Sequence, residues 1–433
     1  MKLPDPGRVG AAVSRSSWPG YTEVNSHGSP DGLRGRRISL RPSNLIRIMP
    51  AKGESVDADV IIAGGGVIGT AIAWRAAIEG LAVTLVDPDN DADKASLVAA
   101  GMLGPVSETV FGEQDLLNVN LLAVGRFPGF TAELEEATGL VTGLRTEGTL
   151  AVAYDSGDLA ALRRLTEFRH SIGLAAEALD AKQCRALEPF LAPGTRGGVL
   201  ATGDLSVDNR RYLAALRAAA GKAGVRNLTG TVTEVAAGAG GARVRARLGD
   251  AQGESELSAR DVVVAAGFAT RQLNGVPDPI RQAVRPVKGQ LLRLRHPEHM
   301  PRVATRTIRA TVQGRDLYIV PRADGEVVVG ATQEERDDRD VTAGAVHDLL
   351  RDAITALPAI SELVLAEASA GLRPGSKDNG PIVGRVRPGL VVATGHFRNG
   401  ILLSAATADA VTAILAGRDA DPAWAPFHPG RLG

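Results

Sequence analysis

A glycine-rich turn between two apolar segments places the strongest constraint on the fold of this chain. Residues 59–63 read Asp-Val-Ile-Ile-Ala, the composition of a buried strand, and the glycine-rich turn follows them. Residues 68–79 then predict a helix, which Gly80 terminates. A second apolar strand is expected at residues 81–87, which completes a parallel βαβ unit of about 30 residues. Such a unit opens a doubly wound α/β sheet.

The turn itself has the spacing of a dinucleotide-binding motif. Gly64 permits the tight turn, Gly66 lets the backbone approach a pyrophosphate, and Gly69 lets the helix pack closely on the strand. The unpaired N–H groups at the start of the helix would face the phosphates. Asp87 ends the second strand, at the position where a carboxylate accepts hydrogen bonds from the ribose hydroxyls.

Two other interpretations of this motif stay open at this point. The turn could belong to an ordinary βαβ fold that binds no nucleotide. If the motif does bind a dinucleotide, that dinucleotide could be NAD or FAD. FAD is favoured because the motif opens the folded region and because the glycine-ended strand at residues 262–267 could close over a dinucleotide.

The composition points to small-molecule partners. Lys plus Arg and Asp plus Glu both total 49 in 433 residues, so the formal net charge is zero and favours neither nucleic acid nor an anionic membrane. The single cysteine, Cys184, excludes an intrachain disulfide and a cysteine-cluster metal site, and no metal is expected. The apolar runs are too short to span a bilayer, so we expect a soluble, cytoplasmic protein.

The first 56 residues are rich in Arg, Ser, Gly and Pro and show no sustained apolar period. They predict a disordered extension without a secretory signal. Met49 is a candidate for the true start of the protein.

Strand ends marked by glycine return at widely separated positions, at Gly64, Gly267 and Gly395. Interleaved domains would explain this spacing. We expect the FAD-binding domain to comprise residues 57–110, 200–275 and 366–433, and the substrate-binding domain to comprise residues 111–199 and 276–365.

Six short segments carry a family resemblance over residues 58–415. They are Ala99-Ala-Gly-Met102, Val287-Lys-Gly-Gln290, Tyr318-Ile-Val-Pro-Arg322, Gly330-Ala-Thr332, Gly371-Leu-Arg-Pro-Gly375 and Gly395-His-Phe-Arg-Asn-Gly-Ile-Leu402. In order and spacing they resemble the glycine oxidase branch of the D-amino-acid oxidase and sarcosine oxidase superfamily of flavoproteins. The resemblance implies a Rossmann-like, doubly wound FAD-binding domain interleaved with a mixed-sheet α+β substrate domain.

The resemblance also implies the residues that hold FAD without a covalent bond. Besides the three glycines of the turn and Asp87, they are Val67, Ile68, Pro88, Ala95, Ser96, Ala100, Gly101, Met102, Val232, Gly267, His396, Phe397, Arg398, Asn399, Gly400, Ile401 and Leu402. The last seven are expected at a helix start beneath the flavin, where the helix dipole would stabilise negative charge on the reduced ring.

Arg373, Arg398 and Tyr318 match the family's ligands for the substrate carboxylate. A guanidinium can bind a carboxylate through two hydrogen bonds, which lysine cannot do. Gln333 departs from the family, which has an apolar residue at this position, and this difference could alter substrate preference.

The implied reaction is oxidation of glycine, or of a similar small amine such as sarcosine or D-alanine, by hydride transfer to the flavin. Oxygen would reoxidise the flavin to give hydrogen peroxide, and water would convert the imine to glyoxylate and ammonia. No residue is expected to act as a catalytic nucleophile or base, because the cofactor carries the chemistry. The resemblance implies a role in making the thiamin thiazole ring, and a homo-oligomer is possible. The alternatives are a D-amino-acid or sarcosine oxidase or dehydrogenase, and a non-catalytic flavin-binding subunit.

Overall fold

The structure is a computed structural model, and it describes residues 57–433 except 89, 92–93 and 250–252. The expected disordered extension and the candidate start at Met49 lie outside the described residues.

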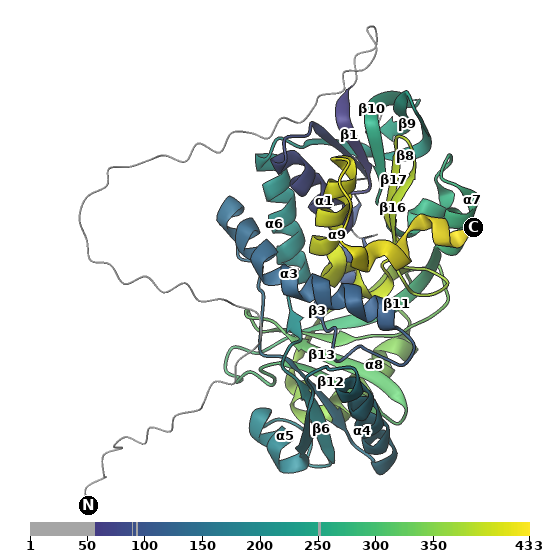
Figure 1. The fold of residues 1–433 in the computed structure, drawn as a ribbon. Helices are drawn as coiled ribbons and strands as arrows, with labels where there is room; N and C mark the ends of the chain where they lie inside the picture. The colour runs from purple at the N-terminus through teal and green to yellow at the C-terminus, as the bar shows by residue number, and fades with distance from the viewer. Residues whose placement is uncertain (1–56, 89, 92–93, 250–252) are drawn as a thin grey trace, which may run out of the picture. The chain divides into compact units, whose positions relative to one another are not determined.

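A seven-stranded sheet forms around the predicted βαβ unit (Figure 1). At its centre β1 pairs in parallel with β2 on one side and with β10 on the other. β8 continues the parallel pairing beyond β2, and β17 continues it beyond β10. The strands of this sheet are β1 (Ala58–Ala63), β2 (Val83–Asp87), β8 (Arg226–Gly238), β9 (Gly241–Leu248), β10 (Ser255–Val264), β16 (Ile382–Arg387) and β17 (Leu390–Thr394).

Helices from the start, middle and end of the described chain cover one face of this sheet. They share a buried core in which Ile72, Phe127, Tyr212 and Leu403 are almost inaccessible to solvent. They are α1 (Val67–Ile78), α3 (Gln114–Thr138), α6 (Asn209–Lys222) and α9 (Gly400–Leu415). A second core, with Ile61, Val262 and Val392, lies on the other face and includes the short α7 (Asp278–Ala283). The sheet is therefore doubly wound.

The second large sheet is mixed and has eight strands. Its order is β15-β11-β14-β13-β12-β4-β6-β5, and the pairing is antiparallel except between β12 and β4. Its strands are β4 (Thr149–Ala153), β5 (Glu177–Asp180), β6 (Gly197–Ala201), β11 (Arg285–Arg295), β12 (Thr307–Val312), β13 (Arg315–Pro321), β14 (Glu326–Gly330) and β15 (Val364–Gly375). Its helices are α4 (Ser156–Ser171), α5 (Ala181–Leu187) and α8 (Ala343–Ala356).

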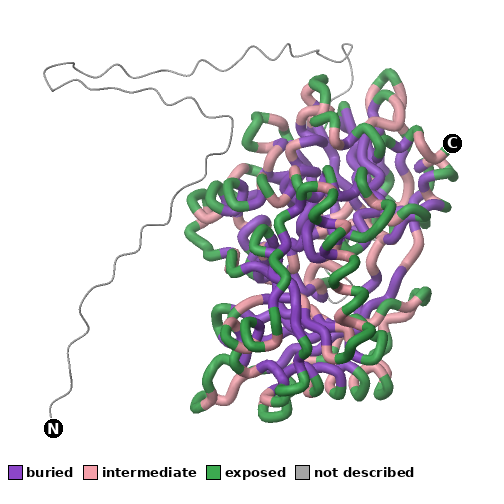
Figure 2. The backbone as a smooth tube through the Cα atoms, turned by 60° about the horizontal axis from the view of Figure 1, so that its bottom comes forward, coloured by how far each residue is buried: buried purple, intermediate pink, exposed green. Residues whose placement is uncertain are grey.

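Short elements connect these layers. They are α2 (Ala95–Val98), β3 (Met102–Leu103), β7 (Leu205–Ser206), η2 (Gly267–Gln272), η3 (Pro358–Glu362), η4 (Phe397–Asn399), η5 (Pro422–Phe427) and η6 (Pro429–Leu432). β3 and β7 pair with each other in a two-stranded sheet. Burial concentrates in the strands and in the helix faces that cover them, as Figure 2 shows.

The chain crosses between the two sheets several times, so the predicted fold class, a doubly wound α/β domain interleaved with a mixed-sheet domain, is confirmed. The predicted residue limits of the domains stay predictions. At one limit, β15 starts in the segment expected for the substrate domain and runs into the segment expected for the FAD domain, and it pairs throughout with β11 of the eight-stranded sheet.

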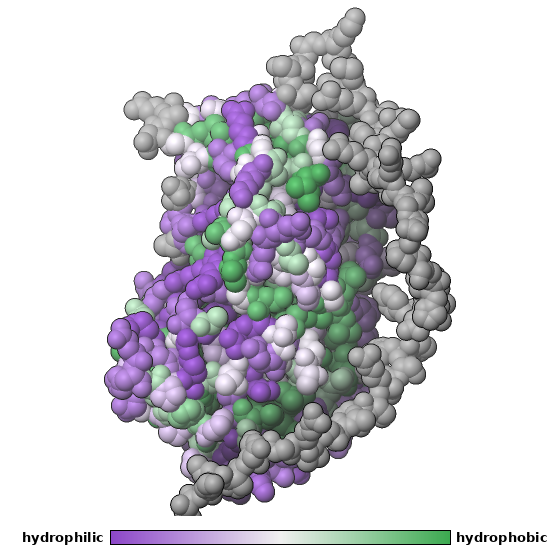
Figure 3. All heavy atoms as spheres, turned by 90° about the vertical axis from the view of Figure 1, so that its left-hand side faces the viewer, coloured by the Kyte–Doolittle hydropathy of each residue, from purple (hydrophilic) through white to green (hydrophobic). Residues whose placement is uncertain are grey.

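On the face drawn in Figure 3, hydrophilic side chains surround smaller hydrophobic areas. Within the described ranges, no helix combines the length and the apolar character that crossing a membrane requires.

Candidate active site

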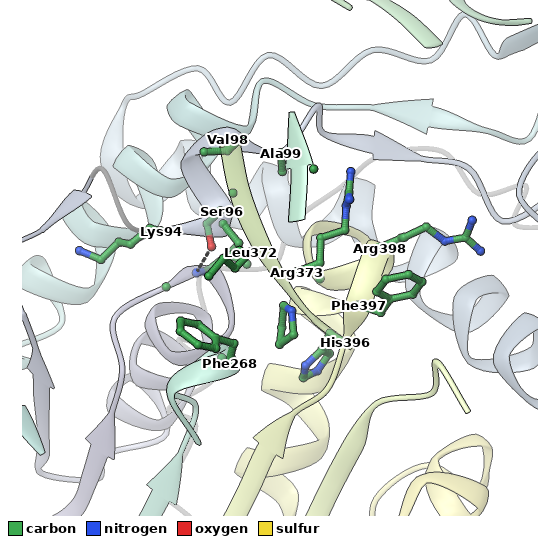
Figure 4. Close-up of a pocket in the computed structure, with 18 of the residues that line it drawn as sticks. Lys94, Ser96, Val98, Ala99, Phe268, Leu372, Arg373, His396, Phe397 and Arg398 are labelled. Carbon is green, nitrogen blue, oxygen red and sulfur yellow. Dashed lines mark hydrogen bonds between the residues drawn. The ribbon is translucent and has the colours of Figure 1, made fainter. Parts of the chain in front are cut away.

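A cavity of about 1190 Å³ runs from the glycine-rich turn to the eight-stranded sheet (Figure 4). Its lining comes from the first βαβ unit, from β8 and η2, and from the segments around β13, β15 and η4. Ligand cavities in proteins commonly measure about 300–1,000 Å³, so this one suits an unusually large ligand.

The turn that opens the cavity cannot accept side chains. Gly64 has a φ of +109°, and a Cβ there would lie 2.5 Å from the Ala265 carbonyl oxygen. A Cβ on Gly69 would lie 1.8 Å from the Gly64 carbonyl oxygen, because the helix packs directly on the turn. Gly66 caps α1 without a side chain, which leaves the backbone open towards the cavity. The geometry agrees with the turn at Gly64 and the close packing at Gly69, and the approach of Gly66 to a pyrophosphate stays a prediction.

Asp87 lies at the carboxyl end of β2 and lines the cavity. Its Oδ2 accepts a hydrogen bond of 2.5 Å from the Gly65 backbone N–H, and its Oδ1 pairs with Lys94 Nζ at 2.7 Å. Two carboxylate oxygens offer about four acceptor positions, so a ribose hydroxyl can still bind. Lys94 was not predicted from the sequence, because it follows the motif by several residues and has no fixed spacing to it.

The segment from Ala95 to Met102 contacts the turn and continues along the cavity. Ser96 Oγ accepts a hydrogen bond of 3.0 Å from the Val67 backbone N–H at the start of α1, the dashed line of Figure 4. Ala95, Ala100 and Gly101 also line the cavity. Their contact with the flavin, which the family resemblance implies, stays a prediction.

Buried side chains outside the cavity lining hold the carbonyl groups of this segment. Asn209 Nδ2 donates to the Ser96 carbonyl oxygen at 2.8 Å, and Arg322 Nη2 donates to the Ala100 carbonyl oxygen at 2.6 Å. Arg322 is 3% exposed, and burial lowers its pKa to about 10. The sequence placed Arg322 in a family motif but indicated no role for it.

The segment that precedes α9 forms another wall of the cavity. His396 is 2% exposed, and burial lowers its pKa to about 3, so the ring is neutral at physiological pH. Its Nε2 lies 3.1 Å from Thr407 Oγ1. Phe397 has a φ of +47°, and the α9 helix begins at Gly400. Gly400 and Ile401, at the N-terminus of α9, line the cavity, and their contact with the flavin stays a prediction.

The end of the cavity that is predicted to bind the substrate, called the substrate end below, is formed by the face of the eight-stranded sheet. Arg373 Nη1 donates to the Thr332 carbonyl oxygen at 3.1 Å, and its guanidinium lies over Gly289. Tyr318 lies opposite Gly330, where a Cβ would come within 2.5 Å of the phenol oxygen. Burial raises the pKa of Tyr318, and the charge of Arg373 partly opposes this rise, so the phenol is a protonated donor near neutral pH.

Arg398 is placed differently from Arg373. The two side chains extend in different directions in Figure 4, and Arg398 is exposed. Its guanidinium carbon lies 5.3 Å from the centre of the Phe397 ring. The structure therefore brings Arg373 and Tyr318 together and leaves Arg398 at the margin of the cavity.

Comparison with known proteins agrees with this geometry. Residues 59–414 match the family model described as FAD dependent oxidoreductase. The chain belongs to this family.

Relatives of this oxidoreductase include the glycine oxidase of Geobacillus kaustophilus, which is 32% identical over 385 residues, with 87% of this chain and 98% of that protein covered. The crystal structure of that organism's glycine oxidase superposes with a TM-score of 0.76 at 31% identity and covers 86% of this chain and 98% of the other. The bifunctional protein ThiO/ThiG of Trichormus variabilis is 32% identical over 376 residues. The resemblance to the glycine oxidase branch is confirmed.

The bifunctional relatives are much longer than the matched region. The match covers 86% of this chain but 55% of the Trichormus protein, so the chain spans about half the length of these relatives.

FAD fits the residues of the cavity. The predicted FAD-binding residues that line it are Gly64, Gly66, Val67, Ile68, Asp87, Pro88, Ala95, Ser96, Ala100, Gly101, Met102, Val232, Gly267, His396, Phe397, Arg398, Gly400 and Ile401. Gly69, Asn399 and Leu402 do not line it; Gly69 packs against the turn, and the other two are buried beside it. Val232 adjoins the register shift in the β8–β9 pairing.

Two groups at the substrate end were given no role from the sequence. Glu108 and Arg309 belong to no motif, whereas Lys288 and Gln290 lie in the family segment Val287-Lys-Gly-Gln290, which indicated no function for them. Glu108 and Arg309 form an ion pair on the cavity wall. Behind Arg373, the fully buried Lys288 pairs with Asp338, and Gln290 Nε2 donates to Glu334 Oε1 at 2.7 Å.

Proposed function

We propose that this FAD-dependent oxidoreductase catalyses oxidative deamination of glycine and of similar small amines such as sarcosine and D-alanine. The observation that carries the proposal is the juxtaposition of Arg373 and Tyr318 on the wall of the cavity that also contains the glycine-rich turn. Relatives named glycine oxidase, which match over nearly their whole length, support the same assignment.

Arg373 is the proposed ligand of the substrate carboxylate. Its Nη1 bonds to protein carbonyl oxygens, which fixes the plane of the guanidinium while other N–H groups of the fork remain available. A guanidinium in a fixed plane can donate two parallel hydrogen bonds to a carboxylate. Tyr318, protonated near neutral pH, supplies a further donor.

Bound FAD would supply the acceptor for the hydride that leaves the α-carbon. The residues of this chain orient the substrate, exclude water and stabilise charge. The N-terminus of α9 would stabilise negative charge at the cavity wall, and the neutral His396 adds no positive charge there.

Arg398 as a second carboxylate ligand stays a prediction. Its guanidinium is exposed and stacked near the Phe397 ring, so binding would require a change of side-chain rotamer towards Arg373. Arginine side chains carry enough rotamer freedom for such a change.

Molecular oxygen as acceptor, with hydrogen peroxide, ammonia and glyoxylate as products, belongs to the proposal. A role in making the thiamin thiazole is supported by the names of the ThiO/ThiG relatives. The cytoplasmic location and the homo-oligomer remain predictions.

An anaerobic reduction panel tests the proposal. Glycine, sarcosine and D-alanine should each bleach the flavin of the purified protein, and reoxidation by air should release peroxide. Bleaching without reaction of the reduced protein with oxygen would favour a dehydrogenase. Failure of all three amines to reduce the flavin would contradict the proposal and favour a non-catalytic flavin subunit.

A further inference from the structure

An ion pair stands beside Tyr318 on the same face of the eight-stranded sheet. Arg309 lies directly opposite Tyr318 in the β12–β13 pairing, so their side chains are neighbours. Arg309 Nη1 donates to Glu108 Oε1 at 2.9 Å, and all three residues line the cavity. The side chains of Glu108 and Arg309 are 14% and 22% exposed, so the pair is largely removed from bulk solvent.

The order of strands places this pair away from Arg373. Arg373 lies over Gly289 of β11, and two strands, β14 and β13, separate β11 from β12. Neighbouring strands are about 4.8 Å apart, so the backbones of β11 and β12 are roughly 14 Å apart. If Arg373 and Tyr318 bind the carboxylate of a ligand, a larger substituent that extends towards β12 would therefore approach Glu108 and Arg309.

Two buried charged residues fix the backbone that presents Glu108. Asp204 is fully buried, and its Oδ1 accepts a hydrogen bond of 2.9 Å from the Val106 backbone N–H. Arg169 is 2% exposed, and its Nη2 donates to the Ser107 carbonyl oxygen at 2.7 Å. Burying such a side chain is costly unless hydrogen bonds compensate for it, and here both side chains bond to the segment next to Glu108. The carboxylate of Glu108 is thus held at a defined place.

The negative charge of Glu108 reaches the substrate end of the cavity. Burial and the charge of Arg373 have the two largest effects on the pKa of Tyr318. The charge of Glu108 has the third largest effect, and it raises that pKa. Arg373 and Glu108 therefore act on the Tyr318 phenol with opposite signs.

We propose that Glu108 is a specificity-determining residue that restricts the cavity to amino acids with a single carboxylate group. The inference rests on the proposed function, in which Arg373 and Tyr318 take the α-carboxylate. Glu108 neutralises the charge of the Arg309 guanidinium, so Arg309 attracts a second carboxylate only weakly. A second carboxylate on the substrate would also face the like charge of Glu108. An uncharged amide of the same shape could accept a hydrogen bond from Arg309 and donate one to Glu108.

Succinate and succinamate provide a matched pair of probes, because they have nearly the same shape and differ by one negative charge. Titration of the oxidised, flavin-loaded protein with each compound, followed by the flavin absorption spectrum, gives two dissociation constants. In the wild type, succinamate should bind at least about tenfold more tightly than succinate. In Glu108→Gln, which releases Arg309, succinate should bind as tightly as succinamate or more tightly.

Three variants serve as controls. Glu108→Asp keeps the charge and should keep the preference for succinamate. Glu79→Gln removes a carboxylate that pairs with Arg418 outside the cavity lining and should leave both constants unchanged. If Glu108→Gln does not retain flavin, Arg309→Gln is informative, because it leaves Glu108 without this cation and should strengthen the preference for succinamate.

Equal affinity of the wild type for the two probes would overturn the inference, and so would an unchanged preference in Glu108→Gln or a weakened preference in Arg309→Gln. These outcomes are separate from failure of the proposed function. If D-alanine bleaches the wild-type flavin while the probes bind equally, the function stands and the role of Glu108 is wrong. If no amino acid bleaches the flavin, the function is wrong whatever the probes show.

Discussion

The guanidinium of Arg373 lies directly over the α-carbon of Gly289 on the neighbouring strand. A Cβ at Gly289 would come within 2.3 Å of the Arg373 Nη atoms, so the arginine occupies space that only glycine leaves free. Gly289 thereby determines where the proposed carboxylate ligand can lie.

Gly289→Ala should displace Arg373 without unfolding the protein. The methyl group meets the far end of a flexible side chain, which can move away at small cost. We expect the KM for glycine to rise by about tenfold or more, the loss of roughly 1.4 kcal/mol of binding free energy, while flavin is retained. Steady-state kinetics and a flavin absorption spectrum check this. Gly344→Ala, in α8, where a Cβ would meet nothing within 4 Å, is the control. An unchanged KM in Gly289→Ala would show that Arg373 does not need this position.

Asp87→Ala should weaken FAD retention while the protein stays folded. The change removes the acceptor proposed for the ribose hydroxyls and also the partner of Lys94 and of the Gly65 N–H. Hydrogen bonds to a charged group contribute about 1.5–3 kcal/mol, so the dissociation constant of FAD should rise by roughly tenfold to a hundredfold. Fluorescence of released flavin during dialysis measures it. If Asp87→Ala retained FAD as well as the wild type does, Asp87 would have only a structural role in the glycine-rich turn.

Arg322→Met should destabilise the fold and loosen the segment beside the flavin position. Arg322 donates to the carbonyl oxygens of Val207 and Ala100, both at 2.6 Å, and methionine would leave these two groups without that donor. A buried polar group that loses its partner costs about 1–3 kcal/mol. We expect the free energy of unfolding to fall by roughly 2–6 kcal/mol in a denaturant titration. A change below about 0.5 kcal/mol, the usual range for surface substitutions, would contradict this account.

Because His396 is held neutral in the folded chain, the free energy of unfolding should decrease as the pH falls below about 6.5. Its pKa in the folded chain is lowered to about 3, whereas an unfolded histidine titrates near 6.5. Between these values the unfolded state binds the additional proton, so acid favours unfolding. The loss attributable to His396 should reach about 2 kcal/mol at pH 5. Unfolding free energies of wild type and His396→Gln at pH 7 and pH 5 test this. Equal pH slopes in the two proteins would show that His396 is not held neutral.

Periodicity made the βαβ unit at the start of the described chain predictable, because glycine, apolar strand and helix follow one another within 30 residues. The long helix α3 was not predicted, since Pro128 lies inside it and local pattern favours a break there. Strand β15 was not predicted either. Its first three residues are exposed and Glu367 is half-buried, so no apolar alternation marks it, and it is a strand because it pairs with β11 along its length.

At the nucleotide end, local spacing indicated the glycine-rich turn and Asp87, and the family resemblance indicated Ser96. The structure places all three on one cavity, and their contact with the nucleotide stays a prediction. The substrate end depends on contacts between distant segments. Glu108 and Arg309 are 201 residues apart and neither belongs to a motif, so only the folded sheet brings them together. Local sequence pattern carries no information about such a pair.

Replacement of Arg373 tests the central claim most directly. Removing one partner of a buried, hydrogen-bonded charge pair costs about 2–5 kcal/mol, equivalent to roughly 30-fold to several thousand-fold in affinity. The decisive measurement is anaerobic flavin reduction at graded glycine concentrations in wild type, Arg373→Ala and Arg373→Lys. We predict that Arg373→Ala shifts half-saturation by at least about 30-fold while flavin stays bound, and that Arg373→Lys recovers only part of the loss, because an ammonium lacks the bidentate geometry. Overlapping saturation curves for wild type and Arg373→Ala would remove Arg373 from the site and contradict the account.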